Sequence, residues 1–134
     1  SSIALKAAGF NPVMVDFADN CLDMEAVLLP FFEADLTKPL PLNAPYGFCT
    51  DVMEHIPPED VDAVINNIMA SAERVFFQIA IVPDMMGQLL KRPLHVSVHS
   101  PEWWRDLFSV LVHTVEWAQS DETEARFYVN RKET

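Results

Sequence analysis

The stretch "YGFCTDVMEHIPPEDVDAVINNIMASAERVFFQIAIV", residues 46–82, decides the fold class of this chain. It opens with a short apolar run over residues 46–50, which is typical of a buried strand. Residues 57–73 predict a helix, because proline and acidic side chains lie near its start and apolar side chains recur at helical spacing. Residues 74–82 are nearly all apolar and predict a strand that is covered on both faces. A strand, a helix and a second strand in this order indicate an α/β protein.

The same patterns continue on both sides of this unit. Upstream, we expect a helix over residues 1–8 that ends at Gly9, a strand over 13–17, a helix over 21–28 and a strand over 31–36. Downstream, we expect a short helix over residues 84–91, a helix over 101–108 capped by Ser100, and two strands over 110–118 and 125–130. The chain therefore predicts one α/β domain, residues 1–134, with a mainly parallel sheet and a C-terminal antiparallel hairpin.

Length and charge limit the class of function. The 134 residues suffice for one domain, and 9 basic against 20 acidic residues give a formal net charge of −11. This acidic balance argues against binding to nucleic acid or to an anionic membrane, because both need clustered Lys and Arg. A small molecule, or a patch on another protein, is the expected partner.

The two cysteines, Cys21 and Cys49, show no CxxC spacing and no cluster with histidine. We interpret them as reduced, partly buried thiols of a cytosolic protein. No stretch approaches the about 20 apolar residues of a membrane span, and no signal-peptide layout is present. The expected location is therefore cytoplasmic.

Five segments carry a resemblance to a known family. They are "VMVDFADNCLD" (13–23), "FFEADLTKPLPL" (31–42), "YGFCTDVMEHIPPEDVDAVINNI" (46–68), "RVFFQIAI" (74–81) and "HVSVHSPEWWRDLF" (95–108). In this order they resemble the second to fifth strands, and the segment before the closing hairpin, of class I S-adenosylmethionine-dependent methyltransferases. The resemblance covers nearly the whole chain and implies a Rossmann-like three-layer sandwich with S-adenosyl-L-methionine as cofactor.

One motif of the family is missing. The family begins with a strand and a glycine-rich turn of the form D-x-G-x-G-x-G, whereas the three glycines here, Gly9, Gly47 and Gly87, form no such turn. In the family that strand lies between the second and the fourth, and each buried backbone group left unpaired costs roughly 1–3 kcal/mol. We therefore expect an N-terminally incomplete domain. An upstream segment is the favoured source of the strand, and a rearranged sheet or a partner strand are the alternatives.

The resemblance assigns the adenosine part of the cofactor to two strand ends. Asp16 matches the acid that binds the ribose hydroxyls, with Phe17 beside it as a wall for the adenine. Asp35 matches the acid that accepts the adenine amino group, with Leu36 packed on the ring. Each acid could instead be a turn or capping residue, as Asp often is.

The resemblance places the methionine part and the acceptor near the third predicted strand end. Thr50 and Asp51 lie there and are candidate cofactor contacts. His55 is a candidate general base for a hydroxyl acceptor, since an imidazole has a suitable pKa; a structural histidine at a helix start is the alternative. His95 and His99 are candidates for binding the acceptor substrate, or else surface residues.

The string "DVMEHIPPED", residues 51–60, also contains possible ligands for a metal ion. Asp51, Glu54 and His55 could bind a divalent ion together with His95 or His99. An E-x-x-E-H version of the string binds magnesium in some O-methyltransferases, but here the first acid is the shorter Asp. Because the D-V-x-E-H-I form is common in relatives without a known metal, we predict no metal site.

These features favour methyl transfer from S-adenosylmethionine to a small-molecule acceptor. No nucleophilic side chain is needed, because the protein mainly aligns the acceptor with the methyl group. The alternative is a degenerate, non-catalytic module that kept the scaffold and binds a protein partner by strand addition. Another nucleotide-binding domain is disfavoured by the lack of G-x-G-x-x-G and of a P-loop. A homo-oligomer is compatible with each reading.

Overall fold

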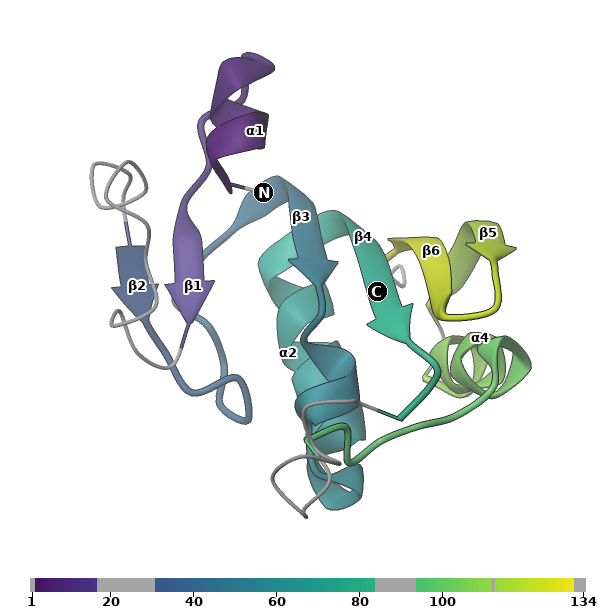
Figure 1. Ribbon diagram of the computed structural model, residues 1–134. Helices are drawn as coiled ribbons and strands as arrows, with labels where there is room; N and C mark the ends of the chain where they lie inside the picture. Colours follow the sequence, from purple (N-terminus) through teal and green to yellow (C-terminus); the bar gives the residue numbers. More distant parts are fainter. Residues whose placement is uncertain (1, 17–30, 84–93, 112, 132–134) are drawn as a thin grey trace.

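A computed structural model of the chain describes residues 2–16, 31–83, 94–111 and 113–131. Its strands are β1 (Met14–Asp16), β2 (Phe31–Glu33), β3 (Ala44–Thr50), β4 (Ala72–Ala80), β5 (Thr114–Ser120) and β6 (Glu124–Asn130). Strands β1 and β2 form a parallel pair of their own, and the others form one sheet in the order β3-β4-β6-β5 (Figure 1). In the larger sheet β3 and β4 are parallel, whereas β6 is antiparallel to both β4 and β5. The hairpin is confirmed, but the larger sheet is mixed rather than mainly parallel.

The described helices are α1 (Ser2–Ala7), α2 (Val61–Ser71) and α4 (Pro101–Val110), with short 3-10 turns η2 (Met53–His55) and η3 (Pro58–Asp60). Two sequence-based expectations about helix ends are confirmed. The Ser100 hydroxyl accepts a hydrogen bond from the Trp103 N–H at 3.2 Å at the start of α4. Gly9 follows α1 with φ 98°, a conformation that glycine adopts without strain.

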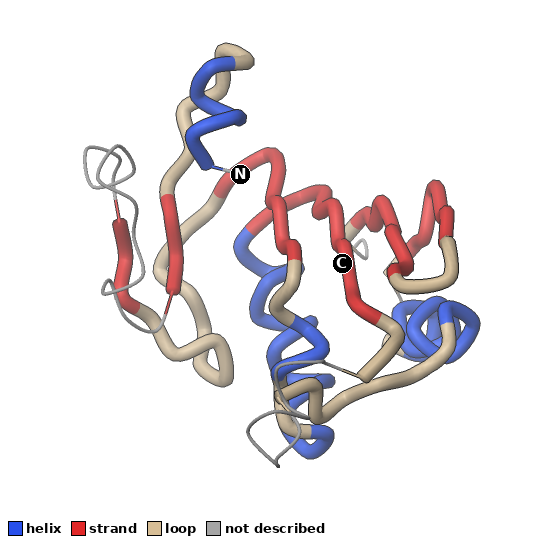
Figure 2. Tube along the Cα trace, viewed as in Figure 1, coloured by secondary structure: helices blue, strands red, loops and turns tan. Residues whose placement is uncertain are grey.

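The core lies between one face of the larger sheet and the helices α2 and α4, shown in blue beside the red strands in Figure 2. Val75, Phe77 and Ile79 of β4 are fully buried on this face. The ring of Phe108 from α4 packs between Phe77 and Phe127, with centroid distances of 5.0 and 5.4 Å. Alternate apolar residues of β4 and β6 thus supply the strand side of the core.

The opposite face of the same sheet is open in the described part of the chain. Phe48, Phe76 and Trp117 form a row of stacked rings across it, with centroid distances of 5.3 and 6.4 Å. Phe48 and Trp117 are each 46% exposed. The expectation that the strand over residues 74–82 is covered on both faces is therefore wrong for the described helices, and two layers are seen instead of three.

Strands β1 and β3 are not hydrogen-bonded to each other, so the parallel strands fall into two groups. Figure 1 shows the two strands side by side with the same direction. Across both groups, Figure 1 shows the order β2-β1 and then β3-β4-β6-β5. This break lies where the resemblance implies an additional strand.

Several predicted boundaries differ from the structure for local reasons. The strand predicted over 31–36 ends at Glu33, because Asp35 and Thr37 form a hydrogen-bonded turn. The strand predicted over 110–118 begins at Thr114, because α4 continues to Val110. The predicted helix over 57–73 opens with η3, so that α2 proper spans Val61–Ser71 and β4 starts directly after it. The helices predicted over 21–28 and 84–91 lie outside the described residues.

Cys49 is a free thiol that is buried in the core, as expected, and burial raises its pKa to about 12. Among the described residues no helix has the length and apolar character to cross a membrane.

Candidate functional site

The candidate site residues follow the carboxyl ends of parallel strands. The arrows of β1, β2, β3 and β4 point the same way in Figure 1, so their carboxyl ends lie along one edge. In open α/β sheets this edge is where ligands bind. Asp16 is the last residue of β1 and lies in register with Glu33 of β2. Phe17 lies outside the described residues.

Asp35 lies just beyond β2 and is exposed. Its Oδ1 accepts hydrogen bonds from the Thr37 hydroxyl at 2.7 Å and the Thr37 N–H at 2.9 Å. These two bonds hold the pKa of the Asp35 carboxyl below its usual value. Asp35 therefore has the turn role that the sequence left open as the alternative. Because both bonds go to Oδ1, the other carboxylate oxygen, Oδ2, is available to a ligand.

Leu36 links this turn to the core. Its side chain packs partly buried against the hydrophobic core, and its carbonyl accepts a hydrogen bond from Asn67 Nδ2 of α2 at 2.9 Å. The packing of Leu36 is therefore explained by the protein itself, without an adenine ring.

Thr50 and Asp51 turn the chain out of β3. Thr50 is half-buried in register with Gln78, and the Asp51 N–H donates to the Gln78 carbonyl at 3.0 Å. Asp51 is exposed and has φ 58°, in the left-handed region that few residues other than glycine, Asn and Asp adopt. This bend directs the chain into η2, which carries Glu54 and His55.

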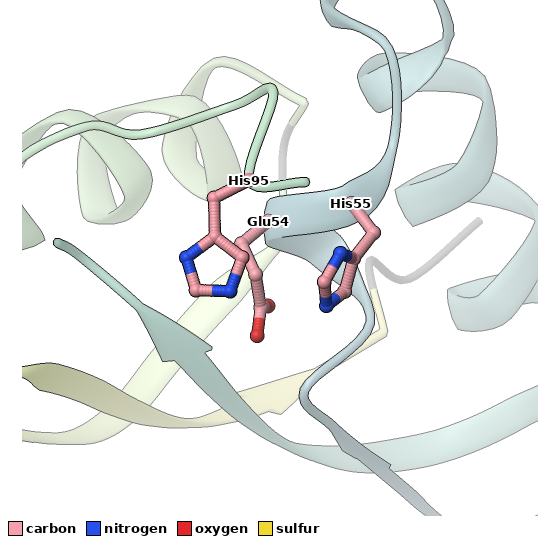
Figure 3. Close-up of side chains that lie close together, drawn as sticks. All are labelled: Glu54, His55 and His95. Carbon is pink, nitrogen blue, oxygen red and sulfur yellow. The ribbon is translucent and has the colours of Figure 1, made fainter. Parts of the chain in front are cut away.

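Glu54, His55 and His95 form a compact group, called here the His–Glu cluster. Each offers one possible ligand atom, and these atoms lie within 4.8 Å of one another. Figure 3 shows the Glu54 carboxylate between the two imidazole rings. The rings of His55 and His95 meet edge to face, with centroids 4.9 Å apart and an interplanar angle of 78°. The sequence places these residues 40 positions apart, so only the fold brings them together.

Backbone hydrogen bonds fasten the segment that carries His95 to η2. The Glu54 carbonyl accepts from the Val96 N–H at 2.9 Å and from the Ser97 N–H at 3.1 Å. The buried Ser97 hydroxyl donates to the Ile56 carbonyl at 2.6 Å. The two halves of the His–Glu cluster are therefore held by the main chain.

Each imidazole of the cluster has its Nδ1 fixed by a carbonyl oxygen. Nδ1 of His55 lies 2.9 Å from the Leu94 carbonyl, and Nδ1 of His95 lies 2.8 Å from the Val82 carbonyl. A carbonyl only accepts, so Nδ1 must carry the proton in both rings. In the neutral rings the lone pair is then on Nε2, ready to accept a proton or to bind an ion.

Glu54 is the least expected member of the cluster. It is 1% exposed, and its Oε2 has no hydrogen-bond partner among the described residues. Burial raises the pKa of its carboxyl, and this outweighs the opposing effects of its backbone hydrogen bond and of His55 and His95. From the sequence, Glu54 was named only as a possible metal ligand. The feature that pointed to it was its position next to His55 in "DVMEH".

His99 does not join the cluster. Its ring stacks on Trp103 with centroids 3.5 Å apart and an interplanar angle of 12°, and burial lowers its pKa. Trp103 is 39% exposed, whereas Trp104 is fully buried. The histidine candidates thus separate into a polar pair, His55 and His95, and one aromatic-packed residue.

No protein-family model matches the chain, and no curated protein sequence matches it. Solved structures do. The chain resembles LepI in complex with SAH and a substrate analogue, with TM-score 0.67 and 12% identity over 97% of this chain and 39% of that chain. It resembles the magnesium protoporphyrin IX methyltransferase ChlM from Synechocystis PCC 6803 with bound SAH, with TM-score 0.54 and 19% identity over 78% of this chain and 52% of that chain.

A third similar structure is the O-methyltransferase NcsB1 from neocarzinostatin biosynthesis, in complex with S-adenosylmethionine and 2-hydroxy-5-methyl naphthoic acid. Its TM-score is 0.59, with 13% identity over 77% of this chain and 33% of that chain. The fold of this chain is therefore that of the class I S-adenosylmethionine-dependent methyltransferases. The chain spans 39% of the length of the LepI chain.

Proposed function

We propose that this chain belongs to an enzyme that transfers a methyl group from S-adenosyl-L-methionine to a small-molecule acceptor. The observation that carries the proposal is the shared edge: Asp16, Asp35 and Asp51 follow the carboxyl ends of three parallel strands in a methyltransferase fold. Several similar structures hold S-adenosylmethionine or SAH, and NcsB1 holds naphthoic acids as well. The fold alone does not decide the reaction, because one similar structure is a pericyclic reaction enzyme.

We assign the adenosine part of the cofactor to the ends of the first two strands. Asp16 would accept hydrogen bonds from the ribose hydroxyls, with Phe17 beside the adenine. Asp35 would accept from the adenine amino group through Oδ2, because Oδ1 already binds Thr37. Thr50 and Asp51 would face the methionine part. Of the two described glycines, Gly9 follows α1 and Gly47 lies inside β3, so neither forms a cradle at this edge.

The acceptor would lie on the side of the histidines. When bound, the cofactor supplies a methyl group on a positively charged sulfur, which is already reactive. The task of this chain is then to hold the acceptor in line and to take up its proton. Nε2 of His55, whose lone pair is free when Nδ1 donates to Leu94, would take a proton from a hydroxyl acceptor. His95 and His99 would contact the rest of the acceptor.

The first test is calorimetric titration of S-adenosylhomocysteine into the purified chain. We expect saturable binding, and a roughly tenfold to hundredfold loss of affinity for Asp16→Ala or Asp35→Ala, since a charge-assisted hydrogen bond contributes about 1.5–3 kcal/mol. No binding to a folded wild-type chain would contradict the proposal.

Asp121 is a matched control for Asp35. Its Oδ1 accepts from the Thr123 N–H at 2.8 Å and the Thr123 hydroxyl at 3.1 Å, the same turn in the β5–β6 hairpin instead of at the carboxyl edge. Asp121→Ala should therefore weaken the local turn without changing the affinity for S-adenosylhomocysteine. Equal losses of affinity for Asp35→Ala and Asp121→Ala would show that Asp35 only stabilises its turn and does not contact the cofactor.

A second candidate function is favoured by the open edge of β3. Strand β3 pairs only with β4 among the described strands, and its other edge carries no hydrogen-bonded strand. An exposed edge of this kind can accept an extended segment of another protein by strand addition. A non-catalytic module would then bind a protein partner and would not bind S-adenosylhomocysteine, which the same titration decides.

A further inference from the structure

The His–Glu cluster has the composition of a metal site rather than of a hydrogen-bonded triad. Its three side chains present possible ligand atoms within 4.8 Å of one another, and no hydrogen bond joins them. Both imidazoles are already oriented by carbonyl oxygens through Nδ1, which is the usual outer arrangement of metal-binding histidines. Their Nε2 atoms are thus left with lone pairs directed to the same region as the carboxylate (Figure 3).

The buried carboxylate is a second, independent sign of a ligand. Glu54 is 1% exposed, and its Oε2 has no partner among the described residues. A buried acceptor without a partner costs roughly 1–3 kcal/mol, so such atoms are few in native proteins. A cation beside Oε2 would remove this cost.

We propose that Glu54, His55 and His95 bind one divalent transition-metal ion, of the Zn²⁺, Co²⁺ or Mn²⁺ class, through one carboxylate oxygen and the two Nε2 atoms. The site does not depend on the proposed methyl transfer. Three protein ligands leave at least one position of the ion open to water or to an acceptor. Two nitrogen ligands favour transition metals over Mg²⁺ and Ca²⁺, which prefer oxygen.

The geometry requires only a small closure of the cluster. Ligands of a tetrahedral Zn²⁺ with bonds of about 2.0–2.2 Å lie about 3.4 Å apart, whereas the atoms here lie within 4.8 Å of one another. The side chains must supply this closure, because the main chain around Glu54 is tied to Val96 and Ser97. The acidic chain, with a net charge of −11, also attracts cations to its surface.

Metal binding and the base role of His55 exclude each other, because both use the lone pair on Nε2. In the metal-loaded chain His55 is a ligand, so proton uptake from an acceptor would pass to another group. The Asp51 carboxylate, three residues before Glu54, is exposed at the same bend and is not needed for the site.

The test is a titration of Co²⁺ alone into the purified chain near neutral pH. Binding is followed by calorimetry and by the visible absorption that Co²⁺ gains when it has nitrogen ligands. We expect saturable binding of one ion, and a loss of affinity of at least tenfold in each of His55→Gln, His95→Gln and Glu54→Gln. Zn²⁺ should displace Co²⁺, and millimolar Mg²⁺ should not.

His99→Gln is the matched control, because His99 stacks on Trp103 and lies outside the cluster. It should bind Co²⁺ like the wild-type chain. Circular dichroism checks that every variant is folded, and the two histidine variants, His55→Gln and His95→Gln, carry the test if Glu54→Gln does not fold. Equal Co²⁺ affinity in the wild-type chain and these two variants would overturn the proposal, as would the absence of saturable binding or displacement by Mg²⁺.

Discussion

Burial in the fold changes the acid–base chemistry of Glu54. Burial raises the pKa of its carboxyl, so the folded chain binds the Glu54 proton more tightly than the unfolded chain does. The ionised form is therefore penalised in the fold. This cost is fully present above the folded pKa, and it disappears as the pH falls below the ordinary value of 4.5.

We predict that Glu54→Gln stabilises the metal-free chain near pH 7, by an amount on the order of 1 kcal/mol. The gain should vanish as the pH approaches 4.5, where the wild-type carboxyl is protonated in both states. Urea unfolding with a chelator present measures the free energy of unfolding at each pH.

Glu59→Gln is the control for this prediction, because Glu59 lies in the neighbouring η3 turn and is exposed. Its free energy of unfolding should match that of the wild-type chain at both pH values. Adding Zn²⁺ should reverse the order, because the ion stabilises only the chain that still binds it. A Glu54→Gln variant that is less stable than the wild-type chain near pH 7 would contradict the prediction.

Candidate site residues could be predicted from the sequence only where they lie at the end of a single strand. Asp16, Asp35, Thr50 and Asp51 were proposed because each lies at the end of a recognisable strand pattern. The pairing of His55 with His95 was only one option of the metal alternative, which left His95 and His99 open, because it depends on the hydrogen bonds of the Glu54 carbonyl with Val96 and Ser97. Such backbone contacts leave no periodic signal in the sequence.

Among the elements, β3 and β4 depend on a glycine at their contact. A Cβ atom at Gly47 would lie 3.0 Å from Val75 Cγ2 and 3.3 Å from Ala72 Cβ, closer than side chains pack. Gly47 does not have a positive φ, so other residues could adopt its backbone conformation. The requirement for glycine at this position is therefore one of space alone.

We predict that Gly47→Ala destabilises the chain by about 1–3 kcal/mol, as an extra methyl group in a packed core does. In a Val75→Ala background the same change should cost much less, because the opposing methyl groups are gone. A double-mutant cycle of unfolding free energies measures this coupling.

Gly9→Ala provides the contrast. Nothing lies within 4 Å of a Cβ at Gly9, but its φ of 98° strains any L side chain. Its cost should be about 1 kcal/mol and should be the same in both backgrounds. Equal coupling of Gly9 and Gly47 to Val75 would disprove the packing argument.

Helices and strands could be predicted from the sequence where the local propensity of the residues and their pattern of burial indicate the same element. The helical spacing behind α2 and the Ser100 cap of α4 placed both helices correctly. The ends of β2 and β5 were placed wrongly, because a side-chain turn at Asp35 and a longer α4 compete with the strand pattern. Local hydrogen bonds, which the hydrophobic pattern does not encode, set these boundaries.

At the scale of the whole molecule, the sequence predicted three layers, and the described residues form two. The apolar run over residues 74–82 indicated burial on both faces, but Phe76 is only partly buried beside Phe48 and Trp117. A run of apolar residues shows that a strand can be covered, and it does not show what covers it. Phe48 belongs to both features, because it lies in the row of rings on the open face and on β3, whose second edge pairs with no described strand.

The exposed Phe48 on this edge strand leads to the last prediction, that the chain associates with itself as its concentration rises. Phe48, 46% exposed on the edge strand, offers an apolar contact next to unpaired backbone groups. Phe48→Lys should keep the chain monomeric, because a charge on an edge strand opposes pairing. Val110→Lys is the control, since Val110 is 74% exposed on α4, away from this edge, and it should associate like the wild-type chain. Sedimentation velocity over a concentration series measures the association. Salt should strengthen it by screening the net charge of −11. A wild-type chain that stays monomeric throughout, or a Phe48→Lys variant that associates equally, would show that the edge is protected by the chain itself.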